Sequence, residues 1–340
     1  MTRGTTALAR GIRMTQAPGL GGPAADCRPA ARRPGPVFHR STLALSPPRG
    51  KMKRMTIPYA MSWEEPASAR ADGFDYDHEV LVALPPSYHV SPDQRYPVLW
   101  SMDGAMAFAV TAGVVNLYTV GKRIPEIIVV GVGHPSEQGM LGFAHRTFDF
   151  FPPGSVWSDP GLGSEYMKEM GFDFEMTRPF MQGDLFLDFL VDQLRPSLGG
   201  KYRMADDHTL WGHSAGGGFA SYALLARPGA FGRFIIGSGT NGLTIDLEAE
   251  YAENHDDLDA RVFIGMADGE LNHAPLNAQR LVSRTTLLAE NLRLRGYPSL
   301  DLHTRLYTDR DHFTVMPLVI GDGLQHVYAD LIAGLEKPNW

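Results

Sequence analysis

The stretch LWGHSAGGGF, residues 210–219, sets a serine between two glycines in the pattern G-x-S-x-G. With 37 glycines in the chain, chance alone gives this pentapeptide in about one such chain in five, so the pattern by itself is weak. Its surroundings strengthen it, because HTLWGHS (208–214) is typical of a strand and GGGFASYALLARP (216–228) of a helix. A strand, a sharp turn at a serine and a helix together predict that Ser214 is a nucleophile.

The glycines of this stretch have a steric explanation. At so sharp a turn we expect Ser214 in a sparsely populated backbone region, where side chains at Gly212 and Gly216 would collide with neighbouring backbone. The helix that follows directs its free N–H groups and positive dipole end toward the serine. The N–H of Ala215 is therefore a candidate donor to an oxyanion. The alternative interpretation is a glycine-rich turn without chemistry.

Outward from this stretch, the chain alternates between predicted strands and helices. Short apolar or alternating runs predict strands, and longer amphipathic runs predict helices. The predicted strands are 78–85, 96–104, 124–133, 208–214, 231–239, 261–269 and 300–308, and the predicted helices are 108–121, 184–198, 216–228, 276–298 and 323–335. Strands that alternate with helices in this way are typical of a parallel sheet. The sequence predicts one α/β domain over residues 55–340, with a doubly wound, mostly parallel sheet.

Residues 134–181 interrupt this alternation. The segment is rich in glycine, proline and aromatic residues and has no sustained period. A stretch of this length inside a compact domain is usually a functional loop or a lid, so we predict a lid-like insertion. The aromatic residues of 143–174 either line and cover a pocket or pack into the core.

A serine nucleophile needs a base, and the base needs an acid to orient it. In α/β-hydrolases the three residues follow in the order Ser, acid, His. His312 lies in a loop after the predicted strand 300–308 and is the expected base. Asp268 follows the strand 261–269 most closely and is the preferred acid, with Glu270 as the alternative. The less favoured acids are Asp309 and Asp311.

Other residues are expected around this triad. The second N–H of the oxyanion hole should come from Gly104 or Ala105, after the strand 96–104, unless Asp103-Gly104 is an ordinary turn. Arg146 is a candidate contact for an anionic group of the substrate, or a structural ion pair with Asp149. His213 lies inside the turn and is a candidate for substrate binding, although packing is the simpler interpretation.

Charge is unevenly distributed along the chain. Residues 1–54 hold eleven Lys and Arg and a single acid, whereas the whole chain has a net charge of −7. This basic segment has neither a helical nor a strand period and no apolar signal core, so we predict that it is disordered and outside the fold. The alternatives are an organelle presequence and a true translation start near Met52 or Met55. Phe38 is the single aromatic residue among these charges, too few for a stacking surface, which disfavours a nucleic-acid partner.

The remaining composition restricts cofactors, partners and location. Cys27 is the only cysteine, so an intrachain disulfide and CxxC zinc sites are excluded, and a cytoplasmic location is expected. No apolar run is long enough to cross a membrane. Dinucleotide, P-loop and HExxH motifs are missing, and the histidines lack metal-ligand spacing. We expect no cofactor, no metal and no membrane partner, and the oligomeric state is left open.

Five ordered stretches resemble the esterase branch of the α/β-hydrolases that includes enterochelin-type siderophore esterases. They lie between about residues 75 and 335, and they are YPVLWSMDGAMAFA, HRTFDFFP, FLDFLVDQLRPSLGGKYR, LWGHSAGGGFASYALLARPGAFGRFIIGSGT and YTDRDHFTVMP. The resemblance implies an esterase with Ser214 as nucleophile and His312 as base. In that branch the acid often follows its strand as G-x-x-[ED], which corresponds to Asp268 after Gly265. SGTN at 238–241 and DRDH at 309–312 depart from the family pattern, and both flank the expected site.

The sequence thus predicts a serine esterase that cleaves a small-molecule carboxylic ester through an acyl-enzyme, siderophore-type esters included. An acyltransferase would use the same triad and differ only in the acceptor that reaches the acyl-enzyme. A hydrolase fold without activity, which serves as a binding protein, is the alternative from another functional class.

Overall fold

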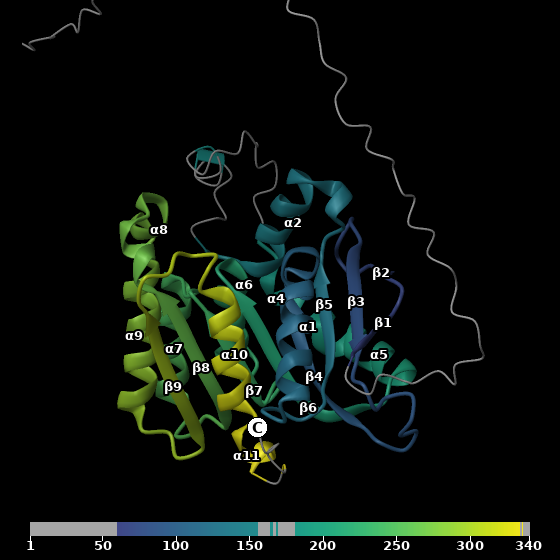
Figure 1. Ribbon diagram of the computed structural model, residues 1–340. Helices are drawn as coiled ribbons and strands as arrows, with labels where there is room; N and C mark the ends of the chain where they lie inside the picture. Colours follow the sequence, from purple (N-terminus) through teal and green to yellow (C-terminus); the bar gives the residue numbers. More distant parts are fainter. Residues whose placement is uncertain (1–59, 156–163, 166–167, 169–180, 334, 336–340) are drawn as a thin grey trace, which may run out of the picture. The chain divides into compact units, whose positions relative to one another are not determined.

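The computed structural model describes residues 60–155, 164–165, 168, 181–333 and 335. Within them, nine strands form one sheet in the order β1-β3-β5-β4-β6-β7-β8-β9, with β2 paired to β3 (Figure 1). The strands are β1 Ser62–Trp63, β2 Ala67–Ala69, β3 His78–Leu84, β4 Tyr96–Met102, β5 Ile128–Gly133, β6 Met204–His213, β7 Arg233–Gly237, β8 Ala260–Ala267 and β9 Leu300–Tyr307. The predicted segment 1–54 lies outside the described residues.

The sheet is mostly parallel, as predicted. Strand β4 pairs in parallel with β5 and β6, and β6 through β9 continue in parallel. Strand β3 pairs in antiparallel orientation with β1, β2 and β5. The carboxyl ends of β4 through β9 therefore meet at one edge of the sheet, where ligands of open α/β sheets bind.

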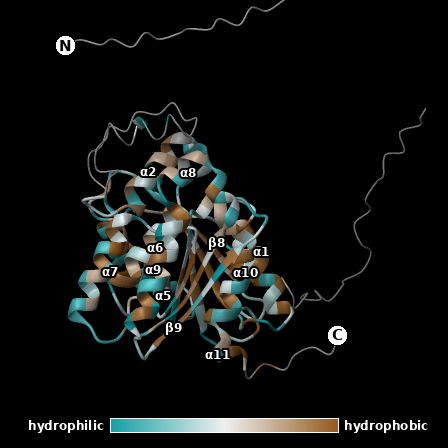
Figure 2. Cartoon of the chain, turned by 90° about the vertical axis from the view of Figure 1, so that its left-hand side faces the viewer, coloured by the Kyte–Doolittle hydropathy of each residue, from teal (hydrophilic) through white to brown (hydrophobic). Residues whose placement is uncertain are grey.

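Helices cover both faces of the sheet (Figure 2). They are α1 Gly104–Val120, η1 Ser136–Gln138, α2 Met140–Phe150, α4 Gly183–Asp188, the π-helical η3 Phe189–Leu194, α5 Arg195–Lys201, α6 Ala215–Ala226, α7 Gly242–Asn254, η4 Asp268–Asn272, α8 Ala274–Ala278, α9 Leu281–Arg295, α10 Met316–Val327 and α11 Ala329–Ile332. The α1 and α10 helices pack on one face, and α4 to α7 and α9 pack on the other.

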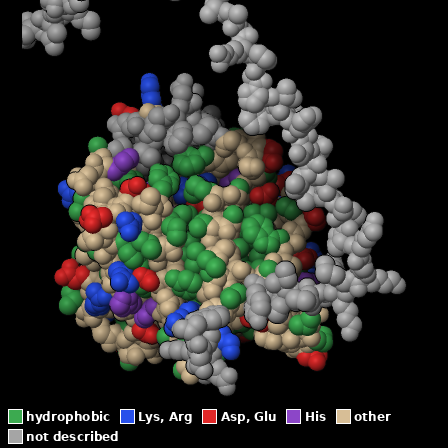
Figure 3. Space-filling model, viewed as in Figure 1, with side chains coloured by type: hydrophobic (Ala, Val, Ile, Leu, Met, Phe, Trp, Pro, Cys, Tyr) green, Lys and Arg blue, Asp and Glu red, His purple; other side chains and the backbone are tan. Residues whose placement is uncertain are grey.

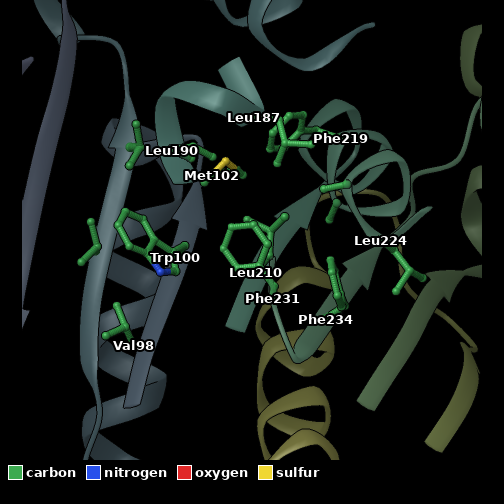
Figure 4. Close-up of a cluster of buried hydrophobic side chains, with 14 of the residues drawn as sticks. Val98, Trp100, Met102, Leu187, Leu190, Leu210, Phe219, Leu224, Phe231 and Phe234 are labelled. Carbon is green, nitrogen blue, oxygen red and sulfur yellow. The ribbon is translucent and has the colours of Figure 1, made fainter. Parts of the chain in front are cut away.

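Alternation along the strands divides the core into these two layers. Trp100 and Leu210 point into the larger cluster with Phe219 of α6 (Figure 4). Leu99 and Trp211 belong to the other cluster, under α1 and α10. Successive strand residues face opposite sides, so a strand buried on both faces must be apolar throughout. This is why the central strands read as continuous apolar runs.

Three predicted helices differ from the observed ones. The helix predicted over 184–198 continues to Lys201 past Pro196, because the wider π-helical turn Phe189–Leu194 precedes it and the proline begins a new helical segment. The helix predicted over 276–298 is split where Arg280 takes a left-handed conformation, with φ 53°. It ends at Gly296 as expected.

The last long helix begins earlier than predicted, at Met316 rather than at residue 323. Its glycines do not break it, because Gly321 packs against Tyr118 and Gly323 against Ile235. Helix α7 was not predicted, although Asn241 caps it by accepting a hydrogen bond from the Thr244 N–H.

The lid-like insertion predicted over 134–181 is described only in part. Residues 136–150 form η1 and α2 beside the carboxyl ends of the strands. Most of 156–180 lies outside the described residues.

Apolar side chains gather on the surface over α1 and α10 (Figure 3). Helix α1 carries no charged residue, and its Met106 and Leu117 are exposed, as is Leu318 of α10. Across the part of the chain that the structure describes, no helix has the length and apolar character needed to cross a bilayer.

Candidate active site

Ser214 occupies the sharp turn between β6 and α6. Its φ of 59° and ψ of −123° lie in a region that non-glycine residues rarely adopt, as predicted for a strained turn. Two backbone hydrogen bonds hold it, from the Ser214 N–H to the Gly237 carbonyl and from the Gly218 N–H to the Ser214 carbonyl. A Cβ at Gly212 would come within 2.1 Å of the Gly216 carbonyl oxygen, so only glycine fits there.

His312 and Glu270 form a buried pair at the same edge of the sheet. The His312 Nδ1 lies 2.6 Å from the Glu270 Oε1, and the Glu270 side chain is fully buried. Since a carboxylate accepts, Nδ1 carries the proton and the Nε2 atom of His312 is left with a lone pair for a base. This is the orientation that a Ser–His–acid triad requires.

The preference for Asp268 as the acid is corrected by this geometry. Asp268 is half-exposed at the start of the 3-10 turn η4, whereas Glu270, two residues on, is 1 % exposed and bonded to His312. The Gly269 N–H donates to the Arg310 carbonyl, and a Cβ at Gly269 would meet that oxygen at 2.4 Å. This close approach holds η4 against the His312 loop and turns Glu270 inward.

The other acids considered at this site have different positions. Asp309 is exposed with a φ of 57°. The exposed Asp311 carboxylate accepts the backbone N–H groups of Phe313 and Thr314 and thereby shapes the loop that leads into α10.

His213, predicted as a candidate for substrate binding or packing, contacts the His312 loop. It is 4 % exposed, and its Nε2 lies 2.6 Å from the His312 carbonyl oxygen. A carbonyl only accepts, so Nε2 donates. Burial, and secondarily the charge of His312, lower the pKa of His213 to about 3, so the ring is neutral near pH 7. His213 therefore positions the backbone that carries His312.

The first turns of α6 and α1 both begin at this edge. The N–H groups of a helix's first turn have no intrahelical acceptor, so those of Ala215, Gly104 and Ala105 are available. The Gly104 nitrogen packs against Gly133, where an added Cβ would come within 2.5 Å. Ala105 lines an open cavity of about 160 Å³ and is the better placed of the two predicted donors.

Arg146 lines the same cavity and forms an ion pair with Asp103, not with Asp149 as the structural alternative predicted. Its Nε and Nη2 both donate to the Asp103 carboxylate, the Nη2 contact being 3.0 Å. Asp103 precedes α1 with a φ of 60° and touches the turn, since a Cβ at Gly216 would lie 3.1 Å from its Oδ2. The pair therefore links α2 to the start of α1, which carries Ala105.

Asp149 lies in a separate buried cluster beside this cavity. Its carboxylate accepts hydrogen bonds from Tyr76 Oη at 2.6 Å, His78 Nε2 at 3.1 Å and His134 Nε2 at 2.8 Å. Burial alone would raise the pKa of Asp149, but hydrogen bonds from His134 and His78 outweigh burial and lower it to about 2. The charged carboxylate is therefore the stable form inside the protein.

This cluster makes stability depend on pH. An unfolded aspartate has a pKa of about 3.9, so the depressed value stabilises the fold by about 2 to 3 kcal/mol above pH 4, and this is lost as the pH falls from about 4 to about 2. We expect Asp149→Asn to lower the free energy of unfolding at pH 7. By pH 3 the free energies of unfolding of variant and wild type should differ by less. Urea denaturation measures both, with the exposed Asp192→Asn as control. A difference that does not change with pH would contradict this account.

Among the residues that the structure describes, two groups of side chains have the geometry to hold a metal ion. The ligand atoms of His78, His134 and Asp149, and those of His213, Glu270 and His312, lie within 4.8 Å of one another in each group. Hydrogen bonds already account for both arrangements. The expectation of no metal stays a prediction.

Part of the chain matches a known protein family. Residues 164–305 match a protein family model described as "Putative esterase". The predicted resemblance to the esterases is confirmed. This family match supports the prediction that the protein hydrolyses carboxylic esters.

Two curated relatives are each 23 % identical to the chain. The ferri-bacillibactin esterase BesA of Bacillus subtilis aligns over 69 % of the chain and 79 % of its own length. The siderophore triacetylfusarinine C esterase of Aspergillus fumigatus aligns over 87 % of the chain and 96 % of its own length.

Solved structures confirm the α/β-hydrolase fold. The siderophore hydrolase EstA of Aspergillus nidulans superposes with a TM-score of 0.65 at 18 % identity, over 86 % of this chain and 99 % of that one. EstB of the same organism gives a TM-score of 0.64 at 20 % identity, over 78 % of this chain and 95 % of that one.

Proposed function

We propose that this esterase cleaves its substrate through an acyl-enzyme, with Ser214 as nucleophile, His312 as base and Glu270 as the orienting acid. The observation that carries the proposal is the 2.6 Å contact between His312 Nδ1 and the buried Glu270 carboxylate, at the sheet edge where Ser214 occupies its strained turn. The chain order Ser, acid, His supports the same triad.

In the proposed reaction, the Ser214 Oγ attacks the ester carbonyl as His312 Nε2 takes its proton. The N–H groups of Ala215 and Ala105 bind the negative oxygen of the tetrahedral intermediate. His312 then gives the proton to the departing alcohol, and Glu270 stabilises the imidazolium in between. Water, deprotonated by His312, attacks the acyl-enzyme and releases the acid, which restores Ser214.

His213 and the Arg146–Asp103 pair would position these groups. The neutral His213 fixes the His312 loop through its carbonyl, and Arg146 holds Asp103 at the start of α1. Small-molecule esters are the proposed substrates. Siderophore esters are the first class to examine, because both curated relatives are named as esterases of siderophores.

The purified protein should release p-nitrophenol from short-chain p-nitrophenyl esters, with a burst if deacylation is slow. It should also react covalently with a fluorophosphonate probe. Adding a primary alcohol tests the acceptor, because an acyltransferase would form the new ester faster than the free acid. Ligand binding with neither turnover nor labelling would contradict the proposal and favour a binding protein.

A further inference from the structure

A second cavity, with a more polar lining than the cavity beside Ala105, lies near the serine turn. It measures about 250 Å³, and its lining includes Ser155, Asn241, Gly242 and Arg284. It adjoins the nucleophile through Gly239, where an added Cβ would come within 2.3 Å of the Ser214 carbonyl oxygen. The cavity begins at the next residue, Thr240, within the SGTN segment that departs from the family pattern.

Two buried polar atoms in this lining have no partner among the described residues. Ser155 is 7 % exposed, and its Oγ makes no hydrogen bond. The Asn241 Nδ2 is also buried and unpartnered, while its Oδ1 is used to cap α7. Buried polar groups are almost always hydrogen-bonded, so such atoms in a cavity wall indicate a site built for a ligand.

The lining is rich in donors. The first N–H groups of α7, at Gly242 and Leu243, have no intrahelical acceptor and lie at the positive end of the helix dipole. The Arg284 guanidinium of α9 approaches this helix start, within 3.9 Å of a Cβ placed at Gly242. In the described part of the chain, Arg284 forms no ion pair. The exposed Asp246 also lines the cavity, and its negative charge opposes the binding of an anion there.

We infer that this cavity is a subsite for a carboxylate, or a similar oxygen-rich anion, carried by one half of the ester substrate. Arg284, Asn241 Nδ2 and Ser155 Oγ would donate to its oxygens, and the apolar cavity beside Ala105 would hold the other half. The inference rests on the proposed function and adds a substrate class to it.

Paired substrates test this inference. One pair places the charge on the acyl side, p-nitrophenyl hydrogen glutarate against p-nitrophenyl valerate. The other pair places it on the alcohol side, 4-carboxyphenyl butyrate against phenyl butyrate. In at least one pair the ratio of kcat/KM should favour the charged ester, and Arg284→Gln should lower that ratio about tenfold or more, the usual effect of a charge-assisted hydrogen bond.

Two further variants sharpen the test. Asn241→Asp keeps the oxygen that caps α7 but replaces the buried donor by an acceptor, so the ratio should fall. Asp246→Asn removes the opposing charge, so the ratio should rise. Arg293→Gln, on the same helix but hydrogen-bonded to Thr304, is the matched control and should leave the ratio unchanged.

Binding separates this inference from the proposed function. Calorimetry with Ser214→Ala protein measures affinity for the same charged and neutral esters without turnover, with and without Arg284→Gln. Arg284-dependent binding of a charged ester that wild type does not hydrolyse would keep the subsite and overturn the esterase mechanism. Hydrolysis with no charge preference in either pair, and binding that ignores Arg284, would overturn the subsite alone.

Discussion

Ser214→Ala is expected to abolish ester hydrolysis, lowering kcat/KM by about four orders of magnitude or more. The serine supplies the only proposed bond to the acyl group, so the variant retains substrate binding and the oxyanion donors but has no nucleophile. Labelling by a fluorophosphonate probe should disappear at the same time. Both are measured on purified protein, by p-nitrophenol release and by intact mass.

The matched control for this variant is Ser221→Ala, about two turns further along the chain in α6. Ser221 is fully buried, and its Oγ only donates to the Gly218 carbonyl of its own helix, so its loss should leave activity and labelling in place. Labelling that survives in Ser214→Ala would mean that another residue is the nucleophile. Circular dichroism checks that both variants are folded.

Glu270→Gln should lower kcat by about three to four orders of magnitude with little change in KM. The amide is isosteric, but it cannot stabilise the imidazolium of His312, and it can favour the wrong tautomer of that ring. Because Glu270 is buried against His312, no water replaces its charge. Steady-state kinetics on a neutral ester measures the effect.

Asp268→Asn distinguishes the two carboxylates that the sequence left open. Asp268 is half-exposed at the start of η4, so its substitution should change kcat/KM by no more than about threefold. If Asp268→Asn were the damaging variant and Glu270→Gln the mild one, the acid assigned from the geometry would be wrong.

Much of the fold follows from local sequence. Strands β4, β5, β7 and β8 and the second half of β6 are buried on both faces, so their apolar runs identify them, whereas the polar start of β6 was not predicted. The glycines around Ser214 mark the turn between β6 and α6. Positions decided by packing were missed or misplaced. The helix predicted to end at residue 198 continues to Lys201 after a π-helical turn. Helix α10 begins seven residues earlier than predicted, with its glycines packed against Tyr118 and Ile235.

The site shows the same division at the level of single side chains. Chain order and strand ends point to Ser214 and His312, whose roles stay predictions. The choice between Asp268 and Glu270 depended on which of the two carboxylates the 3-10 turn η4 directs into the protein. That orientation depends on the packing of Gly269 against the Arg310 carbonyl. Arg146 could not be paired from sequence, because Asp103 and Asp149 both lie within reach of α2.

What the sequence by itself determined is the framework of the site: a serine on a strained turn, a histidine after the last strand and a mostly parallel sheet to hold them. These depend on backbone sterics and hydrophobic periodicity, which act between residues close in the chain. Only the tertiary structure decided which acid meets His312, which aspartate meets Arg146, and that Ser155, Asn241 and Arg284 line one cavity. Those contacts join residues far apart in the chain, and side-chain packing selects among chemically equivalent partners.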